Sequence, residues 1–316
     1  MAVVRQNTEL ELSGVSRVLI ADDEPDVHAV TKLTLKGLAR KYGPMEFVSA
    51  HSGAETIAAL RRDPGIGVVL LDVVMETDHA GLEVSRAIRS DLGNPLVRIL
   101  LRTGQPGIAP EQQTIDAYDI DGYLAKTETS ASRLYTAVRC ALKSYQQLVA
   151  LERHRTYLAG AHDCAVSLQA TMPVEQMLRR VLDAVLTLCP APLVLLELET
   201  FGQAAGPRRL FLYLASDPTA SRAEVAAENT RVRVRAGAHA AEASGPCELD
   251  GGFYMPLRLH HELGHGWLFV DRFAPDEAKR QTLMVLAAHA QNAIYASIAL
   301  AALRERRSLV FQEAAI

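Results

Sequence analysis

The stretch Val18-Leu19-Ile20-Ala21-Asp22-Asp23 joins a short apolar run directly to a pair of acids. Three more apolar runs in the N-terminal part of the chain each lead to one polar side chain: 68–71 to Asp72, 97–101 to Thr103 and 123–125 to Lys126. Short, continuous runs of aliphatic and β-branched residues are typical of strands buried on both faces of a parallel sheet. Because ligands gather beyond the carboxyl ends of such strands, we expect these polar side chains to meet at one edge of a sheet.

The side chains expected at this edge form a site for phosphoryl transfer. Carboxylates held within about 5 Å of one another repel by several kcal/mol at an effective dielectric of roughly 20, unless a cation compensates. Mg²⁺, a hard divalent ion that prefers oxygen ligands, fulfils this need. The metal and Lys126 would neutralise phosphoryl oxygens, Thr103 would donate a hydrogen bond to one of them, and a carboxylate would serve as the nucleophile.

The order and spacing of these residues resemble the receiver domain of bacterial two-component response regulators, and the resemblance covers residues 17–145. It implies a flavodoxin-like, doubly wound parallel sheet of five strands, with Asp72 as the phosphoacceptor. It also implies a set of Mg²⁺ ligands: Asp22, Asp23, Asp72 and the backbone carbonyl of Val74. A sensor histidine kinase or a phosphotransfer protein is the partner that the resemblance implies.

The resemblance assigns roles to three residues near the ends of the later strands. Thr103 and Lys126 are expected to bind the phosphoryl oxygens, and Tyr123 holds the place of an aromatic switch side chain that swings inward on phosphorylation. The loop after the phosphoacceptor departs from the usual pattern, because Glu76 stands where Pro is common and one extra residue precedes Gly81. A simpler alternative for each Asp taken alone is a helix N-cap, and for Tyr123 a packed residue of an edge strand.

A long helix is expected to lead out of the receiver, because no Gly or Pro interrupts residues 132–159. Apolar residues recur along it at alternating steps of four and three: Leu134, Val138, Ala141, Tyr145 and Leu148. This heptad seam favours pairing with the same helix of a second chain, and hence a homodimer. The alternative is an amphipathic helix that packs only on its own receiver.

From residue 160 onward the sequence pattern changes to a helix, several strands and a second helix. The first helix is expected over 174–188, with Thr171 and Glu175 forming a cap at its N-terminus. Strands are expected at 193–199, 209–215, 230–235, 252–260 and 266–272, followed by a long helix that opens at 275–277. This order resembles a GAF-like α/β sensor domain with an antiparallel sheet, of unassigned function, which follows the receiver in one subclass of response regulators.

These expectations divide the chain into five parts: a tail at 1–16, the receiver at 17–145, a signalling helix or linker at 146–160, the GAF-like domain at 161–303 and a tail at 304–316. In the same subclass an HD-GYP cyclic-di-nucleotide phosphodiesterase often comes next, and we expect none before Ile316. We therefore expect a regulator that is not an enzyme, apart from the slow phosphorylation and dephosphorylation of its own aspartate. The alternative is the regulatory part of a longer phosphodiesterase.

Composition and charge favour a cytoplasmic protein. The 316 residues are 49% hydrophobic, enough for two domain cores, and a net charge of −4 argues against direct nucleic-acid binding. The four cysteines form neither a CxxC pair nor a disulfide ladder, which indicates a reducing compartment. Residues 1–14 lack an apolar signal core, and His289, Gln291 and Asn292 interrupt the apolar stretch 285–303, so we expect no membrane span.

One motif raises an enzymatic alternative in the second half of the chain. His261, Glu262 and His265 match the HExxH signature of zinc proteases, in which a helix places both His side chains on one face. The surrounding residues alternate as they do in strands, and two glycines favour a hairpin turn there, so zinc proteolysis is a remote alternative. A ligand pocket around Trp267 and Tyr254 is a further alternative for the GAF-like region.

Overall fold

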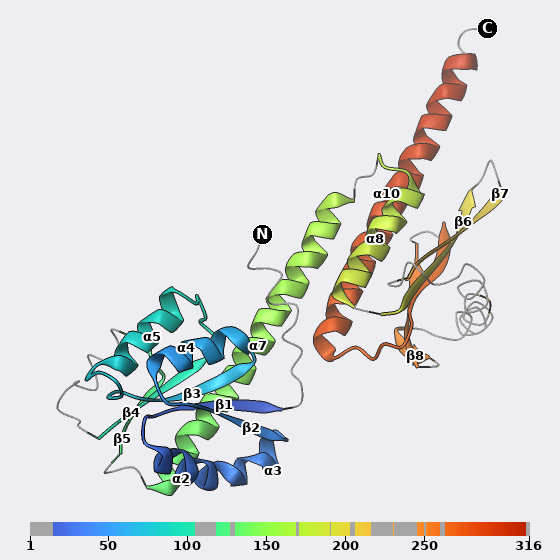
Figure 1. Cartoon of the computed structure of the whole chain (residues 1–316). Coiled ribbons are helices and arrows are strands. Elements are labelled where there is room, and N and C mark those ends of the chain that lie inside the picture. The colour runs from blue at the N-terminus through green and yellow to red at the C-terminus, as the bar shows by residue number, and fades with distance from the viewer. Residues whose placement is uncertain are drawn as a thin grey trace. The chain divides into compact units, whose positions relative to one another are not determined.

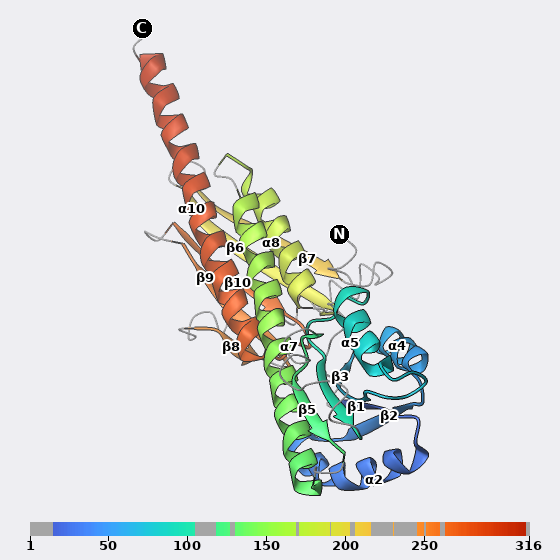
Figure 2. The ribbon, with the colours of Figure 1, turned by 90° about the vertical axis from the view of Figure 1, so that its left-hand side faces the viewer.

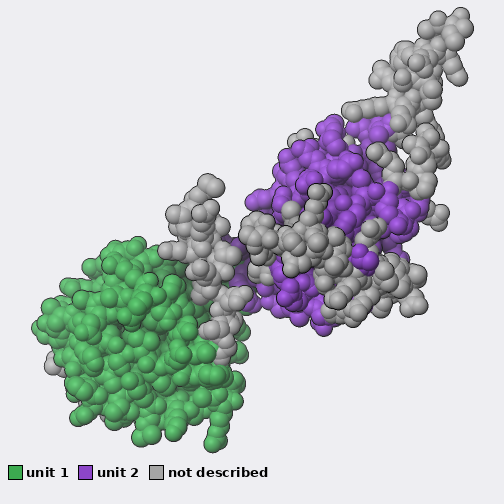
Figure 3. Space-filling model, turned by 45° about the vertical axis from the view of Figure 1, so that its right-hand side comes forward, with its two compact units in different colours: residues 1–152 green, residues 153–316 purple. Residues whose placement is uncertain are grey.

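The computed structural model describes residues 15–104, 118–126, 130–168, 171–189, 191–202, 206–215, 230, 245–249, 251–259 and 263–313. The chain divides into two compact units, residues 1–152 and 153–316 (Figure 3). The boundary at residue 152 lies inside the linker expected at 146–160.

The first unit is built on a parallel sheet of five strands in the order β2-β1-β3-β4-β5 (Figure 1). The strands are β1 (Ser16–Ala21), β2 (Met45–Ala50), β3 (Ile66–Asp72), β4 (Arg98–Thr103) and β5 (Gly122–Ala125). Every residue of the central strand β3 is buried, as its continuous apolar run predicts. This sheet confirms the flavodoxin-like fold expected for the receiver.

Helices cover both faces of this sheet: α2 (Pro25–Leu35), the short η2 (Lys36–Leu38) and α3 (Ala39–Tyr42), α4 (Gly53–Arg62), α5 (Ala80–Ser90) and α7 (Ala131–Ser167). Successive strand residues alternate between the faces. Leu71 and Leu101 pack with α4 and α5, whereas Leu70 and Leu100 pack with α2 and α7. The sheet thus has one hydrophobic core on each side, and the polar strand ends lie between the helices.

Helix α7 is a single unbroken helix, which confirms the prediction of a helix without interruption. It begins next to α2 (Figures 1 and 2), and the first seam residues, Leu134 and Val138, are 5% and 0% exposed within the core of the first unit. Farther along α7, the ring of Tyr145 packs closely on strand β3, because a Cβ atom added to Gly67 would lie only 2.5 Å from that ring. The seam up to Tyr145 therefore packs on its own receiver, and the expectation that it faces a second chain is wrong for these residues.

The second unit combines an antiparallel sheet of order β7-β6-β10-β9-β8 with two further helices, α8 (Val174–Leu188) and α10 (Glu277–Glu313). The strands are β6 (Leu193–Gly202), β7 (Gly206–Ala215), β8 (Cys247–Leu249), β9 (Gly252–Arg258) and β10 (Gly264–Val270). This confirms a separate antiparallel sheet in the C-terminal region. The strand expected at 230–235 lies outside the described residues beyond Thr230.

Helices α8 and α10 lie on one face of this sheet (Figure 1), and their apolar residues form its main core with the inward side chains of β6, β9 and β10. Residues Glu277–Ala301 of α10 are long and apolar enough to cross a membrane, with a mean hydropathy of 1.4. One such helix is weak evidence for a membrane span, because a core helix passes the same test. Leu283, Leu286 and Ile294 of this stretch lie buried in the core, although only 28% of the apolar window is buried.

Candidate functional site

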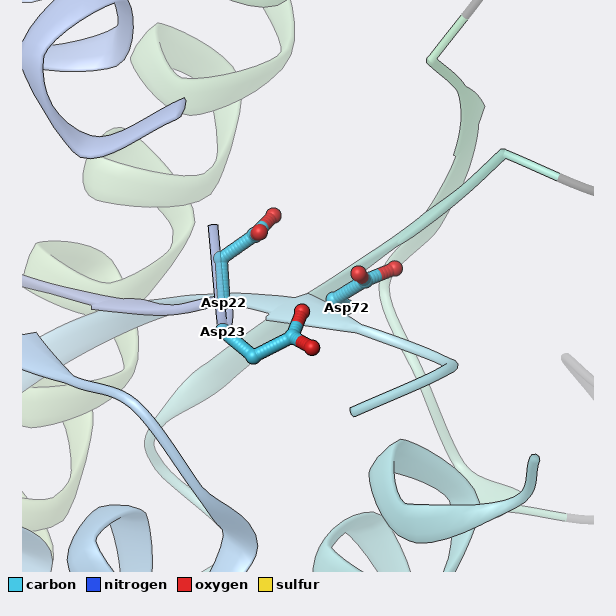
Figure 4. Close-up of side chains that lie close together, drawn as sticks. All are labelled: Asp22, Asp23 and Asp72. Carbon is cyan, nitrogen blue, oxygen red and sulfur yellow. The ribbon is translucent and has the colours of Figure 1, made fainter. Parts of the chain in front are cut away.

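Three carboxylates meet at the carboxyl edge of the receiver sheet (Figure 4). Strands β1 and β3 are paired in parallel with Ala21 beside Leu71, so the next residues along the chain, Asp22 and Asp72, are neighbours. One carboxylate oxygen from each of Asp22, Asp23 and Asp72 lies within 4.8 Å of the others. Asp22 and Asp72 are 1% and 4% exposed, whereas Asp23 is exposed. The structure thus brings together the acids that the sequence analysis singled out.

Lys126, just after β5, is the cation of this cluster. Its Nζ lies 2.7 Å from Oδ2 of Asp72, 3.0 Å from Oδ2 of Asp22 and 3.3 Å from Oε1 of Glu24. Its backbone amide donates a hydrogen bond of 2.6 Å to the carbonyl of Thr103, which fixes the ends of β4 and β5 to each other. Glu24 was not expected in the site, although it directly follows the acid pair in the sequence.

Burial and neighbouring charges shift the pKa values of Asp72 and Lys126. Burial raises the pKa of the Asp72 carboxyl above its usual value, although the ammonium group of Lys126 acts against this. Burial lowers the pKa of Lys126, but the carboxylates of Asp72 and Asp22 outweigh it and leave that pKa raised. Both groups thus hold a proton more tightly than usual, Asp72 chiefly because it is buried and Lys126 because two carboxylates contact it.

The residues present fit Mg²⁺. Oδ2 of Asp72 is bound by Lys126, while its buried Oδ1 has no hydrogen-bond partner within the part of the chain that the structure describes. An unpaired buried carboxylate oxygen is costly, and the cluster offers only carboxylate oxygens, the ligands that this hard cation prefers. Val74, whose carbonyl the resemblance adds to the ligand set, lies partly buried in the loop after Asp72.

The loop that follows Asp72 is held at both ends. The amide of Gly81, at the start of α5, donates to the carbonyl of Val73 over 3.0 Å, and a Cβ atom on Gly81 would lie 2.1 Å from the Asp72 carbonyl oxygen. Glu76 accepts a hydrogen bond of 2.8 Å from the amide of Gly53, at the first residue of α4. The unusual Glu76 therefore ties this loop to the N-terminus of α4, where a carboxylate is electrostatically favoured.

Thr103 is the last residue of β4, Tyr123 lies within β5, and both are buried. Thr103 is 1% exposed and Tyr123 is 8% exposed, in the core that includes Leu101 and Ile120. The aromatic ring of Tyr123 is thus already directed inward in this structure. Its action as a switch remains a prediction.

The other motifs do not gather into a second site among the described residues. His261 and Glu262 lie outside those residues, and His265 lies in strand β10 instead of a helix. Trp267 and Tyr254 are buried in a hydrophobic cluster of the sheet. A groove of about 370 Å³ lies elsewhere in the second unit, between α7 and α8, with Cys164 and Arg180 in its wall.

Comparison with known proteins places the first unit in a family. Residues 18–139 match the response regulator receiver domain, so the chain contains such a domain. The chain is also 37% identical over 171 residues to 3'3'-cGAMP-specific phosphodiesterase 2 of Vibrio cholerae serotype O1. The match covers 54% of this chain and spans only about a third of the relative, 33% of its length. It is longer than the receiver match and therefore extends beyond it.

Solved structures are similar as well. A response regulator receiver domain protein from Clostridium thermocellum is 22% identical, with a TM-score of 0.37, and the match covers 42% of this chain and 98% of that chain. The signal receiver domain of an HD domain-containing protein from Pseudomonas fluorescens Pf-5 is 19% identical, with a TM-score of 0.36, and the match covers 42% of this chain and 90% of that one.

The curated relative corrects one expectation from the sequence. We expected a regulator that is not an enzyme, yet the relative is a phosphodiesterase. The expectation rested on the absence of an HD-GYP domain before Ile316, and that absence does not exclude an enzymatic function. The expectation that the chain is not an enzyme is therefore wrong.

Proposed function

We propose that the chain is a phosphorylation-gated response regulator that accepts a phosphoryl group on Asp72 from a sensor histidine kinase, a phosphotransfer protein or a small phosphodonor. One observation carries this proposal. Asp72 is a buried carboxylate with one oxygen bound to Lys126 and the other without a partner in the described structure, beside the two acids Asp22 and Asp23. No other carboxylate of the described residues combines these features.

Each site residue has a distinct part in this reaction. The Asp72 carboxylate attacks phosphorus, and the leaving group departs from the opposite side. Lys126 and Thr103 bind the oxygens of the transferred group. Mg²⁺, held by Asp22, Asp23, Asp72 and the Val74 carbonyl, supplies positive charge to the same oxygens when it is bound.

Labelling with acetyl phosphate and Mg²⁺ tests the proposal directly. Intact-mass measurement of the wild type is expected to show one added phosphoryl group, and Asp72→Asn is expected to show none. Asp91→Asn is the matched control, because Asp91 is an exposed aspartate at the end of α5. Labelling that persists in Asp72→Asn would contradict the assignment of the phosphoacceptor.

For the output we propose that the second unit is a GAF-like module of a cytoplasmic signalling protein, and that the chain associates as a homodimer through the exposed part of α7. Leu151 and Leu158 lie one heptad apart on that helix and are 64% and 52% exposed. Sedimentation of Leu158→Asp tests this: loss of the dimer supports the assignment, and a dimer that persists contradicts it.

A second candidate function is the regulatory part of a cyclic-di-nucleotide phosphodiesterase. The match to the 3'3'-cGAMP-specific phosphodiesterase supports it, since that match extends beyond the receiver. Incubation of the chain with 3'3'-cGAMP, with and without beryllium fluoride, followed by chromatography, tests whether the chain itself hydrolyses the dinucleotide. A regulatory part alone is expected to leave the dinucleotide intact, whereas hydrolysis that responds to beryllium fluoride in the wild type and not in Asp72→Asn would show that the chain also carries the catalytic part.

A further inference from the structure

Arg102 is a second basic residue beside the phosphoacceptor. It lies on β4 directly opposite Asp72 of β3, and its carbonyl accepts a hydrogen bond of 2.9 Å from the amide of Val73. Side chains in register on adjacent parallel strands lie on the same face of the sheet. Leu70 and Leu100 are the register pair two residues earlier on the same strands, and they share one hydrophobic core. Arg102 therefore lies on the face of the sheet that carries Asp72.

The guanidinium group of Arg102 is anchored at one end. Its Nη1 donates a hydrogen bond of 3.0 Å to Oγ1 of Thr31, a residue of α2 that is 1% exposed. Its Nε is buried and has no acceptor among the residues that the structure describes. A buried Nε donor without an acceptor, on a partly buried guanidinium, is costly unless negative charge lies nearby to compensate.

That negative charge is the acid cluster of the phosphorylation site. Burial lowers the pKa of Arg102, while the carboxylates of Asp22, Asp72 and Glu24 act in the opposite direction. These are the same three carboxylates that Lys126 contacts. Arginine remains protonated in proteins, so its positive charge is permanent.

We propose that Arg102 is a second resident cation of this site, a positioning residue held by Thr31, which stabilises the acid cluster without metal and weakens its affinity for Mg²⁺. Lys126 neutralises the cluster from β5 and Arg102 from β4. A fixed positive charge repels a divalent cation that enters the cluster and attracts an anionic phosphoryl group. The receiver then needs a higher Mg²⁺ concentration to fill its metal site, and it retains the phosphoryl group more firmly. This last consequence rests on the proposed function, whereas the effect on Mg²⁺ does not.

Mg²⁺ titration by calorimetry at low ionic strength tests the proposal. Arg102→Met removes the charge and keeps an unbranched side chain, and it is expected to bind Mg²⁺ about five- to tenfold more tightly than the wild type, a change that roughly 1 to 1.4 kcal/mol produces. Arg102→Lys keeps the charge, and its Mg²⁺ affinity is expected to stay close to that of the wild type. Thermal melting adds a second readout: saturating Mg²⁺ is expected to raise the Tm of Arg102→Met by more than it raises the Tm of the wild type.

A purely structural role for Arg102 gives a different result. Both variants would then be less stable, and their affinity for Mg²⁺ would not depend on the charge at position 102. Equal Mg²⁺ affinity in folded Arg102→Met and wild type overturns the proposal. Arg102→Gln serves as a second neutral variant, in case Arg102→Met does not fold without Mg²⁺. Since the titration involves no phosphoryl transfer, a failure of Asp72 labelling would overturn the proposed function and leave this test intact.

Discussion

Gly81→Ala is the most direct perturbation of the phosphoacceptor backbone. A Cβ atom at this position would lie 2.1 Å from the carbonyl oxygen of Asp72 and 2.9 Å from the Cα of Val73. Both neighbours are backbone atoms, so the start of α5 and the end of β3 must move apart by about 1 Å to restore van der Waals contact. Overpacking of this kind typically costs about 1–3 kcal/mol, which exceeds the gain of up to about 1 kcal/mol from replacing a helical Gly.

The expected result of Gly81→Ala is a less stable receiver with a much slower reaction at Asp72. Displacing a reacting group by about 1 Å can reduce a rate on the order of 100-fold. Denaturant unfolding, monitored by hydrogen exchange of the amides in residues 15–104, measures the stability of the receiver. The rate of labelling by acetyl phosphate measures the reactivity of Asp72. Gly37→Ala is the control in the same unit, because its Cβ atom would meet only the Tyr135 ring, at an ordinary 3.6 Å. A Gly81→Ala protein with wild-type stability and labelling rate would refute the reasoning.

Two further predictions concern charges around the same loop. Glu76→Gln removes the carboxylate that binds the Gly53 amide at the N-terminus of α4, and thermal melting at low salt is expected to show a loss of about 0.3–1 kcal/mol that shrinks at high salt. Asp72→Asn is expected to raise the Tm of the Mg²⁺-free protein at neutral pH, because burial raises the pKa of Asp72 and its ionised form therefore costs stability. That cost is complete above the raised pKa of the folded state, falls as the pH falls through it, and disappears below the ordinary aspartate pKa of 3.8. A stability advantage of Asp72→Asn that grows toward acid pH would contradict the prediction.

The receiver fold and the acid cluster could be predicted because the evidence is local in the sequence. Each buried strand is a continuous apolar run, and Asp22 and Asp72 directly follow two of these runs. Parallel pairing then places the strand ends side by side without any knowledge of the side-chain contacts. The same reasoning could not find the contact of Arg102 with Thr31, because those residues are 71 positions apart and neither belongs to a recognised motif.

The heptad seam of α7 shows a different limit of sequence analysis. A period of 3.5 residues describes one face of a helix, and it does not reveal whether that face packs on its own sheet or on a second helix. Val138 is fully buried within the receiver, so a charged substitution there would disrupt the core and could not report on dimerisation. Strand β8 was missed for a simpler reason, since three residues are too few to display an alternating pattern.

The burial of the seam changes how a signal at Asp72 can leave the receiver. Leu124 is the register partner of Arg102 on β5, and it shares a hydrophobic core with Leu134 and Val138 of α7. A charge change at the site therefore acts on the same face of the sheet that holds the first turns of this helix. Because α7 is unbroken as far as Ser167, a shift of its packed half displaces the remainder as well. Allosteric proteins typically show coupling free energies of about 1–3 kcal/mol. A coupling of this size between Asp72 and α7 requires that the packing of α7 on the sheet differ between the unphosphorylated and the phosphorylated receiver. It does not require an exposed coiled-coil surface.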